Sequence, residues 1–161
     1  MMDKIDSFSL SFEVEDGVYF ERTHGELTLN KKRLGVILQG CVIEAQYQIE
    51  DHFLIITAQS DPYQEEVNIY YFTDDFILKD HLKMQNCVLI TAYEALEKIK
   101  IMGDRILSFE FLTVKPWKLK VFLKPKPYLF VWHPINVFRP GKSYFDKVYL
   151  GISHYLSPIR Q

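Results

Sequence analysis

Apolar and polar residues alternate with a period of two along much of the first half of the chain, which is the pattern of β-strands with one buried face. Turn residues separate these runs: Asp16-Gly17 is typical of a two-residue hairpin turn, and the charged segment 30–33 is expected to lie in water. Successive runs therefore pair as an antiparallel meander. The predicted strands are residues 8–14, 18–20, 27–29, 34–38, 41–49, 53–57 and 67–71.

Two of these strands carry a prediction about burial. Residues 41–49 alternate so regularly that one face, with Ile43 and Tyr47, is expected in the core, and the other face, with Gln46, is expected in water. Residues 53–57 form a nearly continuous apolar run, which predicts a central strand covered on both faces.

The second half of the chain carries helix signals. Residues 92–102 show an apolar stripe at helical spacing, and Thr91 with Glu94 forms a capping box, so we predict a helix there that packs on a sheet face. Residues 143–156 also fit a helix, although their aromatic and β-branched residues would suit a strand. We favour the helix for this segment.

These elements together predict an α+β fold, dominated by an antiparallel β-meander sheet that is open or closed in part into a barrel, with one or two helices packed on it. No internal repeat, low-complexity segment or linker interrupts residues 1–161, which predicts a single domain. The composition, with 48% hydrophobic and 25% charged residues, excludes a disordered chain.

The sequence also bears on the compartment. No stretch approaches the ~18 apolar residues that a membrane helix needs, since Pro134 interrupts the most apolar part, residues 128–138. The first residues lack the basic and apolar regions of a signal peptide, and two cysteines are too few for a disulfide scaffold. We therefore expect a cytoplasmic protein without a membrane role.

Charge is distributed unevenly along the chain. Residues 1–80 hold 16 acidic and 6 basic residues, a net charge of −10, whereas residues 81–161 hold 5 acidic and 13 basic residues, a net charge of +8. The halves either neutralise each other within one fold or form two oppositely charged faces, one of which attracts a charged partner.

Enzyme signatures are missing from the sequence. No glycine-rich phosphate loop and no Gly-x-Ser-x-Gly elbow is present, and the five histidines show no metal-ligand spacing. Asp74-Asp75 with Asp80-His81 is the densest group of polar side chains, but carboxylates after a strand usually cap a turn. We therefore predict a non-catalytic protein without a cofactor or a metal site.

Acidic residues gather in the segments around two predicted turns. A surface of carboxylates with a tyrosine at its centre suits a contact with a basic protein, so the leading hypothesis is a binding protein, such as an inhibitor or immunity-type protein against a basic toxin or nuclease. The oligomeric state is left open. The residues assigned to this surface are Glu44, Glu50, Asp51, Asp61, Tyr63, Glu65 and Glu66.

A lysine-rich strand supports an alternative. Residues 117–124 alternate apolar residues with lysines, and further lysines and aromatic residues follow within 115–132. Such a face binds nucleic acid, or its lysines protect an exposed sheet edge from pairing. A third hypothesis is a carrier of small apolar ligands, based on the many inward aromatic residues. The candidate nucleic-acid residues are Lys118, Lys120, Phe122, Lys124 and Lys126.

Overall fold

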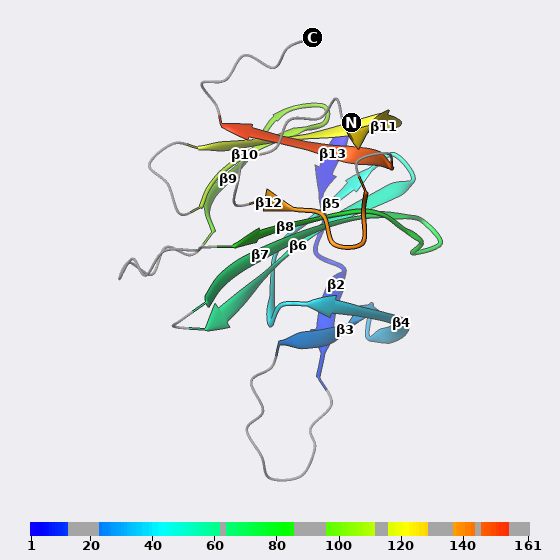
Figure 1. Ribbon diagram of the computed structural model, residues 1–161. Helices are drawn as coiled ribbons and strands as arrows, with labels where there is room; N and C mark the ends of the chain where they lie inside the picture. Colours follow the sequence, from blue (N-terminus) through cyan, green and yellow to red (C-terminus); the bar gives the residue numbers. More distant parts are fainter. Residues whose placement is uncertain are drawn as a thin grey trace.

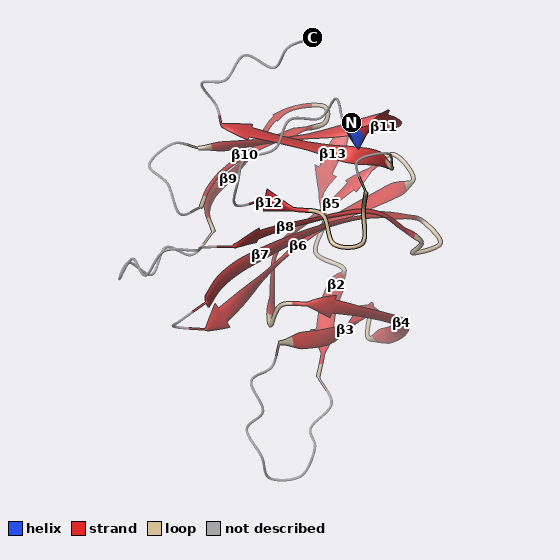
Figure 2. Cartoon of the chain, in the orientation of Figure 1, coloured by secondary structure: helices blue, strands red, loops and turns tan. Residues whose placement is uncertain are grey.

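The described part of the protein consists of β-strands. The computed structural model describes residues 1–12, 23–61, 64–85, 96–111, 116–128, 137–143 and 146–154, and only the backbone of residues 60, 61, 64, 65, 97 and 154. Strands hold about 75% of the described residues, and within these ranges Tyr128 alone is helical, which does not make up a helix (Figure 2). The prediction of an α+β fold is therefore wrong. The same ranges contain no helix of the length and hydropathy that crossing a membrane requires.

The largest sheet has six antiparallel strands. Strands β5 to β8 follow one another both in sequence and in space, which confirms a meander in this part of the chain. In spatial order the strands are β1 (Met2–Lys4), β5 (Val42–Ile49), β6 (His52–Asp61), β7 (Gln64–Thr73), β8 (Leu78–Gln85) and β12 (Val137–Phe138).

Two smaller antiparallel sheets lie on opposite faces of the six-stranded sheet (Figure 1). The four-stranded sheet has the order β13 (Lys147–His154), β11 (Trp117–Pro127), β10 (Ile106–Glu110) and β9 (Glu97–Gly103). The three-stranded sheet has the order β2 (Phe8–Ser11), β3 (His24–Leu29) and β4 (Lys32–Gln39). The described strands thus form three stacked layers, and the expectation of a partly closed barrel is wrong.

Apolar side chains fill both spaces between the layers. Leu54 and Ile56 of β6 belong to a buried cluster that also contains Leu119 of the four-stranded sheet. On the opposite face of β6, Ile55 packs in a second cluster with Leu27 of the three-stranded sheet. This arrangement confirms the prediction that residues 53–57 form a strand covered on both faces.

The predicted helix at residues 92–102 is wrong over its described part, because Glu97–Gly103 form β9. In this segment the helical stripe coincides with a period-two pattern, in which Lys98 and Lys100 alternate with Ile99 and Ile101. Both a helix and a strand fit this pattern, and backbone pairing with β10 selects the strand. The predicted cap, Thr91, lies outside the described residues.

The predicted C-terminal helix is also wrong, because Lys147–His154 form β13, which pairs with β11. The capping pair does interact: the Ser143 backbone N–H donates a hydrogen bond of 2.6 Å to Asp146 Oδ2, and Asp146 N donates one of 3.0 Å to Ser143 O. These bonds close a turn before a strand. The Ser143–Asp146 capping motif therefore forms a turn here and does not start a helix.

The expectation of one wet face on residues 41–49 is wrong as well. A register shift between Ile43 and Ala45 turns Ile43 towards the second cluster, whereas Tyr47 stays in the first. On the supposedly wet face, Gln46 is buried, and its Oε1 accepts hydrogen bonds of 3.0 Å from Ser7 N and 2.8 Å from Phe8 N. The chain leading into β2 crosses this face at Gln46 and covers it there, whereas Gln48 on the same face is exposed.

Candidate functional site

The acidic residues assigned to one surface lie in different places. Glu50 and Asp51 are exposed in the turn before β6, whereas Asp61 ends the same strand, about 30 Å away at ~3.3 Å per residue. Glu44 is half-buried, and burial raises the pKa of its carboxyl. The side chains of Asp61 and Glu65 and the whole of Tyr63 lie outside the described part. Among the assigned residues whose side chains are described, Glu50 and Asp51 therefore share an exposed surface.

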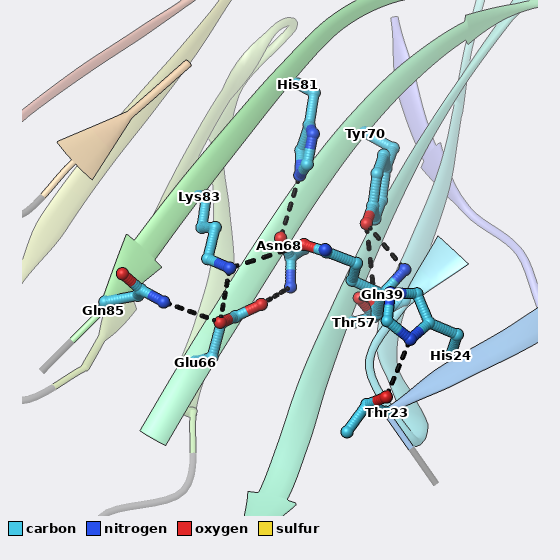
Figure 3. Close-up of polar contacts among 10 residues, drawn as sticks. All are labelled: Thr23, His24, Gln39, Thr57, Glu66, Asn68, Tyr70, His81, Lys83 and Gln85. Atoms are coloured by element: carbon cyan, nitrogen blue, oxygen red, sulfur yellow. Dashed lines mark hydrogen bonds and ion pairs between the residues drawn. The ribbon is translucent and has the colours of Figure 1, made fainter. Parts of the chain in front are cut away.

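Glu66 is buried in a polar network on the face of the six-stranded sheet that carries the three-stranded sheet (Figure 3). Lys83 Nζ lies 2.7 Å from its Oε2, Gln85 Nε2 donates to the same oxygen at 2.9 Å, and Asn68 Nδ2 donates to Oε1 at 2.8 Å. Burial alone would raise the pKa of the Glu66 carboxyl, but these hydrogen bonds outweigh it and lower the pKa. Glu66 is thus neutralised inside the protein.

The same network includes a histidine with an unusual environment. Asn68 donates through its amide nitrogen to Glu66, so its Oδ1 accepts from His81 Nε2 at 2.9 Å. The His81 ring stacks on Tyr70, with centroids 4.3 Å apart. Burial, reinforced by the positive charge of Lys83, lowers the pKa of His81 to about 4. His81 is therefore neutral at pH 7.

The network also connects the layers. Gln39, at the end of β4, donates its backbone N–H to Tyr70 Oη at 2.9 Å, and its carbonyl accepts from Thr57 Oγ1 at 2.5 Å (Figure 3). Lys83 Nζ reaches Gln39 Oε1 at 3.5 Å. Because nearly all of these polar groups satisfy one another, the network stabilises the junction of two sheets.

Asp80 and His81, which the sequence placed in one polar group, point to opposite faces of β8. Asp80 is buried against β13, where Arg139 Nη1 donates to both of its oxygens at 2.6 and 2.7 Å, and the backbone N–H groups of Tyr149 and Leu150 donate to Oδ2 at 2.7 and 2.8 Å. Arg139 also donates to the Leu150 carbonyl. Asp80 thus joins two sheets, and within the described ranges no three metal-ligating side chains cluster.

Asp74 and Asp75 contribute to a different surface. His52, the first residue of β6, pairs with Thr73, the last residue of β7, so the turn at Glu50 and Asp51 lies beside the turn at Asp74 and Asp75. All four carboxylates are exposed. The sequence had separated them, because 22 positions lie between the two pairs and only strand pairing brings these turns together.

An aromatic anchor holds the second turn in an unfavourable conformation. Phe76 has φ +59°, which is rare for a bulky residue, and its ring packs 5.9 Å from Phe8 and 5.7 Å from Phe53. Thr73 stabilises the turn, since its N–H donates to Ile77 O at 3.1 Å and its Oγ1 accepts from Ile77 N at 3.1 Å. The anchored ring fixes the direction in which the next two side chains leave the turn.

Those two side chains are apolar and exposed. Ile77 is 58% exposed and Leu78 is 49% exposed, although the neighbouring Phe76 ring is partly buried against the second cluster. Ordered apolar side chains beside charges are typical of interaction surfaces. We name Glu50, Asp51, Asp74, Asp75, Ile77 and Leu78 the acidic turn patch.

The candidate nucleic-acid residues lie on β11. Trp117 and Leu119 point into the core, so Lys118, Lys120 and Phe122 lie on the outer face of the four-stranded sheet, where all three are half-buried. Lys124 and Lys126 are exposed beyond a register shift that starts after Val121. The structure therefore keeps Lys118, Lys120 and Phe122 together and interrupts the predicted register before the remaining two lysines.

Much of the charge asymmetry along the chain becomes an asymmetry between layers. The strands of the four-stranded sheet contain seven lysines and two glutamates, a net charge of +5. The strands of the six-stranded sheet contain six acidic and three basic residues, a net charge of −3. The net charge of the strands thus differs in sign between these two sheets.

Most of the described aromatic residues, on which the carrier hypothesis is based, pack within the two clusters described above; examples are Phe109 and Trp117, and Trp117 Nε1 donates a hydrogen bond to Phe111 O at 2.8 Å. They therefore lend that hypothesis no support. Comparison with protein families, curated proteins and solved structures finds no match to this chain. The function must therefore be inferred from the surfaces of the chain itself.

Proposed function

We propose that this protein is a non-catalytic cytoplasmic binding protein that engages a basic protein partner through the acidic turn patch. The observation that carries the proposal is the exposure of Ile77 and Leu78 on an ordered turn beside four carboxylates. Apolar anchors supply the buried centre of an interface, and surrounding charges select the partner and steer its approach.

The turn conformation supports this proposal. A bulky residue with positive φ costs about 1–3 kcal/mol, and such strain persists where the surroundings enforce it. Packing of Phe76 on Phe8 and Phe53 enforces it here. The partner that fits is a protein surface with an apolar pocket rimmed by lysine or arginine, the chemistry expected of a basic toxin or nuclease blocked by an inhibitor or immunity-type protein.

Two double variants test the patch. Ile77→Ser with Leu78→Ser removes both anchors, and we expect at least about 10-fold weaker binding, because a central anchor contributes more than ~1 kcal/mol. Glu50→Lys with Asp75→Lys reverses the charge of two side chains that make no hydrogen bond to other described residues. We expect slower association with a weaker salt dependence.

The partner is sought by passing cell extract over the immobilised wild type. Retained proteins are identified and purified, and their binding to the wild type and to each variant is titrated by biolayer interferometry.

The matched control is Asp3→Lys with Asp104→Lys, which makes the same charge change at two exposed positions outside the patch. It should bind as the wild type does. If a retained basic protein binds both patch variants with unchanged affinity and association rate, the contact lies elsewhere and the proposal is wrong.

A further inference from the structure

The outer face of the four-stranded sheet carries lysines that no described carboxylate neutralises. Lys98 Nζ lies 2.7 Å from Glu110 Oε2, whereas Lys100, Lys118 and Lys120 have no ion-pair partner among the described residues. We name Lys100, Lys118, Lys120 and Phe122 the lysine face. It lies on a different sheet from the acidic turn patch and plays no part in the proposed function.

Strand pairing sets the spacing of these lysines. Lys100 lies opposite Ser108, which lies opposite Lys118, so two strand separations of ~4.8 Å place the two lysines about 10 Å apart. Lys118 and Lys120 are two positions apart on β11, about 7 Å. A spacing of about 7 Å between Lys118 and Lys120 matches the distance between successive phosphates of an extended nucleic acid strand.

Lys118 and Lys120 have mostly small neighbours across the sheet. Lys118 lies between Ser108 and Ser153, and Lys120 lies between Gly151 and Ile106. A flat sheet does not enter the groove of a duplex, which admits a helix or a narrow ribbon, whereas the unpaired bases of a single strand lie readily on a sheet face.

An aromatic ring completes the arrangement. Phe122 is half-buried at the end of the lysine run, and Lys120 Nζ lies 5.8 Å from its ring centroid. Bases stack on such rings without regard to sequence, and lysines beside the ring bind the phosphates. The position of β11 between β10 and β13 also argues against edge protection for Lys118 and Lys120, because this part of the strand is no edge.

We propose that the lysine face binds single-stranded nucleic acid, with phosphates along β11 and a base stacked on Phe122. The probe is a fluorescein-labelled thymidine oligonucleotide about 12 nucleotides long, since single-strand sites span ~4–16 nucleotides. Fluorescence anisotropy over a salt series should show binding that weakens as salt rises. Lys100→Gln, Lys118→Gln and Lys120→Gln together should reduce the log–log salt slope by about 2, at ~0.7 for each lost phosphate contact.

Phe122→Leu separates stacking from charge. It should weaken binding about 5- to 150-fold, as expected for loss of a stack worth ~1–3 kcal/mol, and should leave the salt slope unchanged. The matched control is Lys4→Gln, Lys31→Gln and Lys32→Gln, which removes the same charge at three exposed positions outside the face. It should bind nearly as the wild type does. Urea midpoints equal to that of the wild type confirm that each variant is folded.

Three outcomes would overturn the proposal. The first is a wild type that shows no salt-dependent binding of the oligonucleotide. The second is an equal loss of affinity in the lysine-face variant and in the control, which would indicate attraction by overall charge. The third is equal competition by heparin or by a duplex of the same length, together with an unaltered affinity of Phe122→Leu, which would indicate binding of any polyanion.

Discussion

Two buried carboxylates, Glu66 and Asp80, show how partners decide the role of a charged residue. The sequence placed Glu66 on an acidic surface and Asp80 in a turn, but each is buried, accepts several hydrogen bonds and contacts a cation, Lys83 or Arg139. A buried charge is tolerated only when it is paired in this way. The sequence does not suggest either pairing, because Lys83 is 17 positions from Glu66 and Arg139 is 59 positions from Asp80.

His81 predicts a pH dependence of folding. Its pKa is about 4 in the folded protein and ~6.5 when unfolded, so the unfolded chain binds more protons between these values. The contribution of the neutral His81 side chain to the free energy of unfolding is complete above about pH 6.5. It is lost as the pH falls towards 4, by up to ~3 kcal/mol.

Urea unfolding at pH 7 and at pH 5 should show a smaller loss of stability for His81→Gln than for the wild type. His24→Gln changes an exposed histidine and should keep the wild-type loss; equal losses in all three proteins would contradict the assignment.

At the scale of elements, turn chemistry was the most reliable signal in the sequence. The charged segment 30–33 was expected to reverse the chain, and the structure confirms a hairpin in which Leu29 pairs with Lys32. Asn30 and Lys31 have φ +50° and +69°, the positive values that a tight two-residue turn demands. Local steric constraints of this kind do not depend on the remainder of the fold.

The same turn predicts a stabilising substitution. Lys31→Gly should raise the free energy of unfolding by about 0.5–1 kcal/mol, because glycine has no Cβ to oppose a positive φ. Lys32→Gly, one position later, should lower it by a similar amount, since that residue is extended in β4. Urea midpoints of the two variants decide the matter: a loss of stability in Lys31→Gly would show that the turn has another conformation in solution.

At the scale of the whole molecule, the shared core predicts cooperative unfolding. The cluster between the six-stranded and four-stranded sheets contains residues of both, among them Tyr71 and Trp117. Trp132→Phe leaves Trp117 as the only tryptophan, so fluorescence then reports on the four-stranded sheet, whereas far-UV circular dichroism reports on all strands. The two urea transitions should coincide. Separate midpoints would contradict the prediction of a single domain.

The sequence by itself determined the parts of this protein that depend on near neighbours: the strands at residues 53–57 and 117–124, the tight turn at Asn30 and the outward position of Lys118 and Lys120. Only the tertiary structure decided whether residues 97–103 and 147–154 are strand or helix, because β9 and β13 obtain their backbone hydrogen bonds from β10 and β11. It also decided which carboxylates are exposed. Burial depends on which distant segments pack together, and a single strand's alternation shows that two faces differ but not what covers each of them.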